Sequence, residues 1–254
     1  MELWDTHCHL DVPRFDPDRD QVLDTARRAG LVGILVPGIG RAGWDFLLRL
    51  CAGQPDLYPA LGLHPLYLDQ HRDQDLDVLA ALIPAAAPLA IGEIGLDFAM
   101  PGLDPRRQQE LFEAQLRLAL EFDLPVLLHV RKAHDQVLAT LKRFRVRGGI
   151  AHAFNGSLQQ GMDYLRLGFC LGFGGMLTFE RSRRLRGLAR DLPPEALVLE
   201  TDAPDLTVAA HRWERNSPAY LPDCLWALAQ ARDQDPEQIA ALTSGNARRV
   251  LGLA

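Results

Sequence analysis

Eight short, strongly apolar segments recur along the 254 residues, and the stretches between them carry helix signals. Runs of Val, Ile and Leu are typical of strands in a parallel sheet, because such strands are covered on both faces. Strand and helix alternating eight times predict an α/β fold of the (β/α)8, or TIM-barrel, type, and such barrels have about 250 residues. We expect a single domain over residues 1–254. The expected strands are residues 2–7, 32–37, 58–63, 89–93, 125–130, 149–152, 168–172 and 197–201.

Prolines preceded by capping residues predict where two of the helices begin. Asp16-Pro17 and Asp104-Pro105 each place a capping side chain before a proline that suits a first helical turn. Gly30 is suited to end the first helix. In the helix after Asp104, apolar residues recur at helical spacing and predict the face toward the barrel. These residues are Leu111, Leu118 and Phe122.

The main alternative is an open, doubly wound parallel sheet. No GxGxxG motif follows the first apolar segment, where a pair of histidines stands instead, so the barrel is favoured. No Gly/Ser linker divides the chain. After the last expected strand, residues 202–216 predict a long loop, and residues 219–231 and 235–251 predict helices that close the outside of the barrel.

Charge and composition limit the partners and the cellular location that we expect for the chain. The net charge of −6 argues against a broad surface that coats nucleic acid, although a local arginine cluster could still bind a phosphate backbone. The four cysteines are scattered and predict reduced thiols. No apolar stretch approaches the roughly 18 residues of a membrane span, and the start lacks a basic signal-peptide region. We expect a cytoplasmic protein with no membrane or obligate protein partner.

His7 and His9 lie at the end of the first expected strand. Residues i and i+2 of a strand point to the same side, so the two imidazoles could bind one transition-metal ion. Cys8 between them is expected to turn to the opposite face and pack there.

Side chains that can bind metals stand at the ends of five further expected strands. The carboxyl ends of barrel strands converge at the end where active sites of this fold lie. Clustered buried imidazoles need partners and repel one another when protonated, and a metal ion removes both problems. The sequence therefore predicts a metal centre. The further side chains are His64, Glu93, His129, His152 and Asp202.

Five motifs, taken in chain order, closely resemble the TatD family of metal-dependent deoxyribonucleases, which are TIM barrels of the amidohydrolase type. The motifs are HxH at 7–9, GEIGLD at 92–97, LHVR at 128–131, AHAF at 151–154 and ETDAP at 200–204. The resemblance implies two divalent cations, one held by His7, His9 and Asp202 and the other by His129 and His152. Glu93 would bridge them.

Related barrels often use a carbamylated lysine as the bridge between their metals. Lys132 and Lys142 are the only lysines of this chain, and neither is expected at the right strand end. A carboxylate bridge from Glu93 is therefore favoured. The ligand set suits Zn, Mn, Co or Ni, and the resemblance adds Mg, so we expect two divalent cations among Mg, Mn and Zn.

Two cations close together suit the hydrolysis of phosphodiesters. Asp202 is the expected general base, with the cap of a following helix as its alternative role. His64 is expected to donate a hydrogen bond to phosphate or to the transition state instead of serving as a primary ligand. His64-Pro65 could equally form a turn.

Three further residues are expected to bind substrate. Arg131 follows the fifth strand, and Arg181 follows a glycine-rich segment, 172–175, that could approach phosphate or could form only a tight turn beside solvated arginines. Trp213, between arginines, could stack a base or could pack over the barrel rim.

The sequence leaves three functions to compare. The first is a DNase that acts on DNA ends, single-stranded or frayed. The second is a hydrolase of a small ester, lactone or amide on the same barrel, which the negative charge favours. The third is a non-catalytic metal-binding scaffold, which is disfavoured because a scaffold does not need a base such as Asp202.

Overall fold

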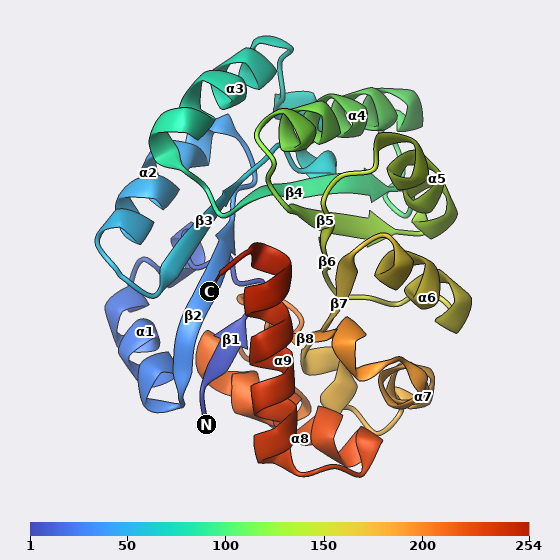
Figure 1. Cartoon of the computed structure of the whole chain (residues 1–254). Coiled ribbons are helices and arrows are strands. Elements are labelled where there is room, and N and C mark those ends of the chain that lie inside the picture. The colour runs from blue at the N-terminus through green and yellow to red at the C-terminus, as the bar shows by residue number, and fades with distance from the viewer. Residues whose placement is uncertain (254) are drawn as a thin grey trace.

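The computed structural model describes residues 1–253 and contains eight parallel strands arranged as a barrel (Figure 1). Each strand pairs with the next in chain order. Thr6 donates a backbone hydrogen bond to Leu199, and Cys8 pairs with Ala203, so the last strand also meets the first. The predicted TIM barrel is confirmed. The strands are β1 (Leu3–Asp5), β2 (Leu31–Pro37), β3 (Leu57–Leu61), β4 (Ala90–Asp97), β5 (Val126–Arg131), β6 (Gly149–Ala151), β7 (Phe169–Phe173) and β8 (Leu197–Leu199).

Helices surround the strands (Figure 1). Asp104 caps α4 as predicted, because its side chain accepts a hydrogen bond from the Arg106 amide at 2.9 Å. The predicted cap at Asp16 is wrong: its carboxylate binds the Arg19 guanidinium, and α1 begins only at Arg19. The helices are α1 (Arg19–Arg28), α2 (Arg41–Ala52), α3 (Gln74–Ala86), α4 (Pro105–Glu121), α5 (His134–Phe144), α6 (Leu158–Arg166), α7 (Arg183–Asp191), α8 (Leu221–Arg232) and α9 (Pro236–Leu251).

The strand that carries Glu93 is longer than the sequence predicts. It was expected to end at Glu93, but β4 continues for four more residues, to Asp97. Gly95, Leu96 and Asp97 pair with β5 after a register irregularity between Ile91 and Ile94. The extension brings Asp97 beside the metal-binding side chains of β5.

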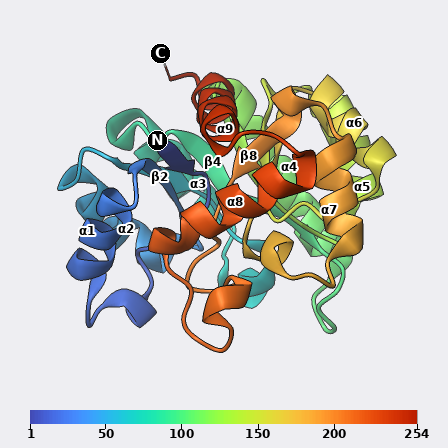
Figure 2. The ribbon, with the colours of Figure 1, turned by 90° about the horizontal axis from the view of Figure 1, so that it is seen from below.

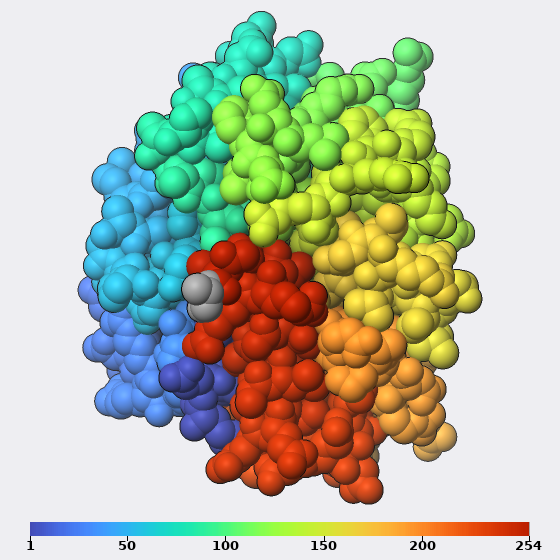
Figure 3. Space-filling model, in the orientation of Figure 1, coloured from blue at the N-terminus to red at the C-terminus, as the bar shows by residue number. Residues whose placement is uncertain are grey.

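The last helix closes one end of the barrel. In Figure 1, α9 lies across the amino-terminal ends of the strands, and in the space-filling view its atoms cover this end (Figure 3). Ala247, Val250 and Leu251 of α9 pack on one buried layer of barrel residues that includes Trp4 and Leu127. The expectation that this helix closes the outside of the barrel is therefore corrected: it seals the end.

The other end of the barrel carries the loops that follow the strands. Figure 2 shows α9 at one end and the loop after β8 at the opposite end. Along the described residues, no helix is both long enough and apolar enough to cross a bilayer.

Candidate metal centre

Three of the predicted ligands gather at the carboxyl ends of β1 and β8. The Nε2 atoms of His7 and His9 are 3.2 Å apart. His7 Nε2 lies 3.5 Å from Asp202 Oδ1 and 3.2 Å from Glu93 Oε2. Both histidines thus present the same ring nitrogen to one point, as the i, i+2 spacing predicts. Cys8 points away and is fully buried among apolar residues, as expected.

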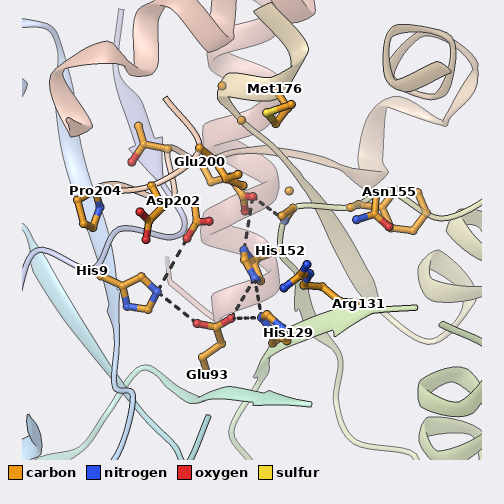
Figure 4. Close-up of a pocket in the computed structure, with 18 of the residues that line it drawn as sticks. His9, Glu93, His129, Arg131, His152, Asn155, Met176, Glu200, Asp202 and Pro204 are labelled. Atoms are coloured by element: carbon orange, nitrogen blue, oxygen red, sulfur yellow. Dashed lines mark hydrogen bonds and ion pairs between the residues drawn. The ribbon is translucent and has the colours of Figure 1, made fainter. Parts of the chain in front are cut away.

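A second group surrounds the other oxygen of the same carboxylate (Figure 4). Glu93 Oε1 lies 2.9 Å from His129 Nδ1 and 2.9 Å from His152 Nε2. The two oxygens of Glu93 therefore face different sets of histidines: Oε2 faces His7 and His9, and Oε1 faces His129, His152 and His64. This is the arrangement that a bridging carboxylate requires.

The donor set fits divalent cations. Glu93 is 1 % exposed, and its Oε2 atom has no hydrogen-bond partner within residues 1–253. An unsatisfied buried carboxylate oxygen is costly, and a cation at this point would satisfy it. Imidazole nitrogens together with carboxylate oxygens suit Zn, Mn and similar ions.

Burial and the surrounding carboxylates shift the pKa values of the histidines in opposite directions. Burial by itself lowers the pKa of His152 and of His9, but Glu93 together with Asp202 and other nearby carboxylates raises the pKa of His152 to about 10 and that of His9 to about 9. Burial lowers the pKa of His7 well below its usual value. The cluster thus holds both charged and neutral imidazoles until cations replace the protons.

His64 and His129 lie beside Glu93 in one group that could hold a cation, but their hydrogen bonds differ. His129 donates from Nε2 to Asp97 Oδ2 at 2.9 Å, and its Nδ1, which hydrogen-bonds to Glu93 Oε1 at 2.9 Å, is the nitrogen that a cation would take. His64 accepts the Leu66 amide at Nδ1, so a neutral ring carries its proton on Nε2, 3.2 Å from Glu93 Oε1. In this tautomer His64 is a hydrogen-bond donor to the site.

His64 also begins a turn, which was the alternative role considered for His64-Pro65. It caps a short 3-10 helix, Pro65–Gln70, through the same Nδ1 contact. The turn holds the ring in place, and Nε2 remains directed at Glu93.

Asp202 lies beside the first group of ligands and caps no helix. Its φ of +56° turns the chain sharply, and the next helical residues begin only at Ala209. The alternative role as a helix cap is therefore wrong. Burial raises the pKa of Asp202, which makes its carboxylate a better proton acceptor than an exposed one.

Sequence reasoning missed three buried carboxylates around the centre. Asp97 orients His129, and Asp5 accepts from Thr201 Oγ1 at 2.6 Å and from the His7 amide at 3.2 Å. Glu200 accepts the Ala153 amide at 2.6 Å. Burial raises the pKa of Asp5 to about 7 and that of Glu200 to about 8. Period-two alternation from Glu93 was the available signal for Asp97.

A cavity of about 1160 Å³ opens above these ligands. His64, Arg131 and Arg181 line it. Arg131 lies 3.2 Å from Asp97 Oδ2, whereas Arg181 forms no hydrogen bond or ion pair within residues 1–253 and lies 5.7 Å from the centroid of the Phe179 ring. The structure therefore brings both arginines to the wall of the site.

Trp213 does not line this cavity. Its side chain is 87 % exposed, and the Arg212 guanidinium lies 4.6 Å from the centroid of its ring. Packing over the barrel rim, one of the two roles considered for Trp213, is therefore wrong. Its ring is free to contact a ligand.

Packing requires glycines at the end of β7 and directly after it. A Cβ at Gly172 would lie 1.9 Å from Glu200 Oε2, and one at Gly175 would lie 2.1 Å from the Leu206 carbonyl oxygen. Glycine at 172 therefore leaves room for the Glu200 side chain. Glycine at 175 lets the loops after β7 and β8 approach each other.

Comparisons with known proteins show the family to which the chain belongs. The model of the family described as "TatD related DNase" matches residues 4–252. An uncharacterized metal-dependent hydrolase of Escherichia coli K12, YjjV, is 39 % identical over 247 residues, 95 % of each chain. The crystal structure of YjjV superposes with a TM-score of 0.95 at 37 % identity, covering 99 % of this chain and 98 % of that one.

A second group of relatives carries the name of an activity. The 3'-5' ssDNA/RNA exonuclease TatD of Salmonella typhimurium is 36 % identical over 254 residues, and the alignment covers 97 % of each protein. The family match, the shared barrel and these full-length relatives lead to one conclusion. The chain belongs to the TatD family of metal-dependent hydrolases.

Proposed function

We propose that this chain is a deoxyribonuclease that cleaves phosphodiester bonds at single-stranded or frayed DNA ends with the help of two divalent cations. The observation that carries the proposal is the carboxylate of Glu93, whose two oxygens lie within 3.4 Å of His7 and His9 on one side and 2.9 Å from His129 and His152 on the other. Two metal positions joined by one carboxylate suit phosphodiester hydrolysis.

The residues divide into two sets of ligands. His7, His9 and Asp202 would hold one cation, and His129 and His152 the other, with Glu93 shared. When bound, the cations would polarise the phosphoryl oxygen and increase the acidity of a water molecule. The ligands lie at the closed end of the cavity, with exposed fractions of 14 % or less for the side chains of His7, His9, Glu93 and Asp202.

Protein side chains would supply the proton transfers and the orientation. Asp202 would accept the proton of the attacking water, which its raised pKa favours. His64, with its Nε2 proton directed into the site, would donate to a phosphoryl oxygen as negative charge develops there. Removing a catalytic base of this kind typically costs about 100-fold or more in rate.

Arginines and an exposed aromatic ring would hold the strand. Arg181 has no partner within the described chain, so its charge is available to a phosphate, and Arg131 would bind a second one. Trp213 would stack on a base outside the cavity. Relatives named as 3'-5' ssDNA/RNA exonucleases make a nucleic-acid end the favoured substrate.

The burial of the ligands favours ends over intact duplex. A duplex carries its phosphates on a wide, stiff cylinder, whereas a single-stranded end can enter a cavity and bring one phosphate to its closed end. We therefore expect single-stranded or frayed DNA to be cleaved faster than blunt duplex.

End-labelled single-stranded DNA, blunt duplex and RNA would be incubated with metal-stripped protein after Mg, Mn or Zn is restored singly. Asp202→Asn would be tested beside the parent. We expect metal-dependent shortening of the single strand that the variant lacks. Tight cation binding without cleavage of any nucleic acid would refute the proposal, and equal cleavage by Asp202→Asn would remove the base from it.

One observation favours a second function, the hydrolysis of a small ester, lactone or amide. The cavity walls include Phe154, Phe173, Met176 and Leu206, and the chain carries a net charge of −6. Apolar walls suit a compact organic substrate. Faster cleavage of an aryl ester or a lactone than of any DNA would establish this function instead.

A further inference from the structure

Helix α4 carries two buried amide side chains on the face that packs against the barrel. Gln108 is 1 % exposed and Gln115 is fully buried. Seven residues are two helical turns, so the two side chains project from the same face, one above the other. A buried side-chain amide destabilises the fold unless its donors and its acceptor form hydrogen bonds, so both glutamines need partners inside the protein.

Gln115 binds the peptide that leads into His64. Its Oε1 accepts the Leu63 amide at 2.7 Å, and its Nε2 donates to the Leu63 carbonyl at 3.2 Å. Leu63 lies two residues beyond β3, where no neighbouring strand pairs with it. The side chain of Gln115 therefore replaces a strand at this point and fixes the backbone immediately before His64.

The backbone of His64 itself is held by two more contacts. Its amide donates to the Ile39 carbonyl, and its carbonyl accepts from His71 Nε2, both at 2.9 Å. Together with Gln115, these contacts orient the His64 ring so that Nε2 faces Glu93.

Gln108 makes the same pair of bonds to Asp97. Its Oε1 accepts the Asp97 amide at 2.8 Å, and its Nε2 donates to the Asp97 carbonyl at 3.0 Å. The Asp97 carboxylate in turn accepts from His129 Nε2 at 2.9 Å. Gln108 thus fixes the backbone of Asp97, the residue whose carboxylate binds His129 Nε2.

We propose that Gln108 and Gln115 are positioning residues that align two different components of the metal centre from one helix. Gln108 acts through Asp97 on the ligand His129, and Gln115 acts through Leu63 on the donor His64. The proposal rests on the proposed function for the role of His64, and on the ligand geometry alone for the role of Gln108. Because the targets differ, the two glutamines should affect different properties.

Replacing each glutamine with leucine keeps its approximate size and its helix propensity while removing the amide. Gln109→Leu is the matched control, because Gln109 lies on the same turn and binds Glu113 and Thr140 away from the centre. Three quantities would be measured: the affinities for Mn and Zn by competition with a chelating dye, the kcat on single-stranded DNA, and the tautomer of His64 by 15N-histidine NMR.

We expect Gln108→Leu to weaken the binding of one cation by about 10-fold, as for other residues that support a metal ligand. We expect Gln115→Leu to leave cation affinity within about two-fold of the parent, to change the His64 tautomer, and to lower kcat by about 10-fold. Gln109→Leu should match the parent in all three.

Behaviour of Gln108→Leu and Gln115→Leu that matches Gln109→Leu would overturn the proposal, and so would a lowered Tm with unchanged affinity and tautomer. If the leucine variants do not fold, Gln108→Met and Gln115→Met, which keep the unbranched side chain, give the same comparison. A parent protein that cleaves no DNA would refute the proposed function alone, because affinity and tautomer still test the glutamines.

Discussion

Asp97 accepts a hydrogen bond from Nε2 of His129 at 2.9 Å, and this contact determines which ring nitrogen of His129 faces Glu93. An asparagine at this position would offer an NH2 group or a weaker acceptor and would loosen the ring. We expect Asp97→Asn to reduce the affinity for one of the two cations by about 10-fold, as measured by calorimetry.

Asp56→Asn is the control for that substitution, because the Asp56 carboxylate binds the Arg27 guanidinium and neither residue lines the cavity. Unchanged cation affinity in Asp97→Asn would show that His129 keeps its orientation without the carboxylate. Equal losses in both variants would point to a general effect of removed charge.

Cation binding should release protons and strengthen as the pH rises. In the metal-free protein, burial lowers the pKa values of His9 and His152, but Glu93 and the other nearby carboxylates raise them to about 9 and about 10, so both rings are charged at pH 7. A cation must displace these protons, and each released proton makes affinity rise by up to about 10-fold per pH unit below the pKa.

Calorimetry in two buffers with different ionisation heats measures the number of protons released at pH 7. We expect at least about one proton per pair of cations. An affinity that stays constant between pH 7 and pH 9 would contradict the charged state of these imidazoles.

Trp213→Ala should weaken binding of single-stranded DNA and spare small substrates. Stacking of a base on an aromatic ring contributes about 1–3 kcal/mol, so we expect the KM for single-stranded DNA to rise at least about five-fold. The KM for a small phosphodiester should not change, because Trp213 does not line the cavity. Similar changes for both substrates would exclude a stacking role.

Gly172→Ala should destabilise the fold. The new Cβ would lie 1.9 Å from Glu200 Oε2 in the buried space between β7 and β8, and overpacking of this kind costs about 1–3 kcal/mol. Denaturant unfolding measures the loss. Adding Glu200→Ala to the variant should recover part of it, because the two positions are in contact.

Gly187→Ala is the matched control in α7, where an added Cβ meets no atom within 4 Å. It should raise the free energy of unfolding by roughly 0.5–1 kcal/mol, as expected for glycine in a helix. A Gly172→Ala protein as stable as this control would mean that Glu200 can move aside without cost.

The eight strands could be predicted because each is a short apolar run bounded by polar or turn residues. The ends of β1, β3 and β8 come two residues earlier than predicted, and the largest difference is at the end of β4. Gly95 and Asp97 are poor strand formers, so the segment after Glu93 was not counted as strand, but pairing with β5 extends it to Asp97. Such an extension depends on a neighbour distant in the sequence.

The metal-binding residues could be predicted because strand alternation and strand ends place them together. The residues that orient them could not. Gln108 and Gln115 interrupt an apolar stripe, and a search for hydrophobic periodicity passes over them. Of the predicted stripe, Leu111 is buried, whereas Leu118 and Phe122 are only partly buried.

The position of α9 has a consequence for how the protein is made. Its 16 residues leave the ribosome after all eight strands, yet they cover the layer that contains Trp4 from the first strand. Until they emerge, the barrel has an open apolar end, and synthesis at about 5–20 residues per second leaves that end uncovered for seconds. During this interval the nascent barrel is exposed to aggregation through that end.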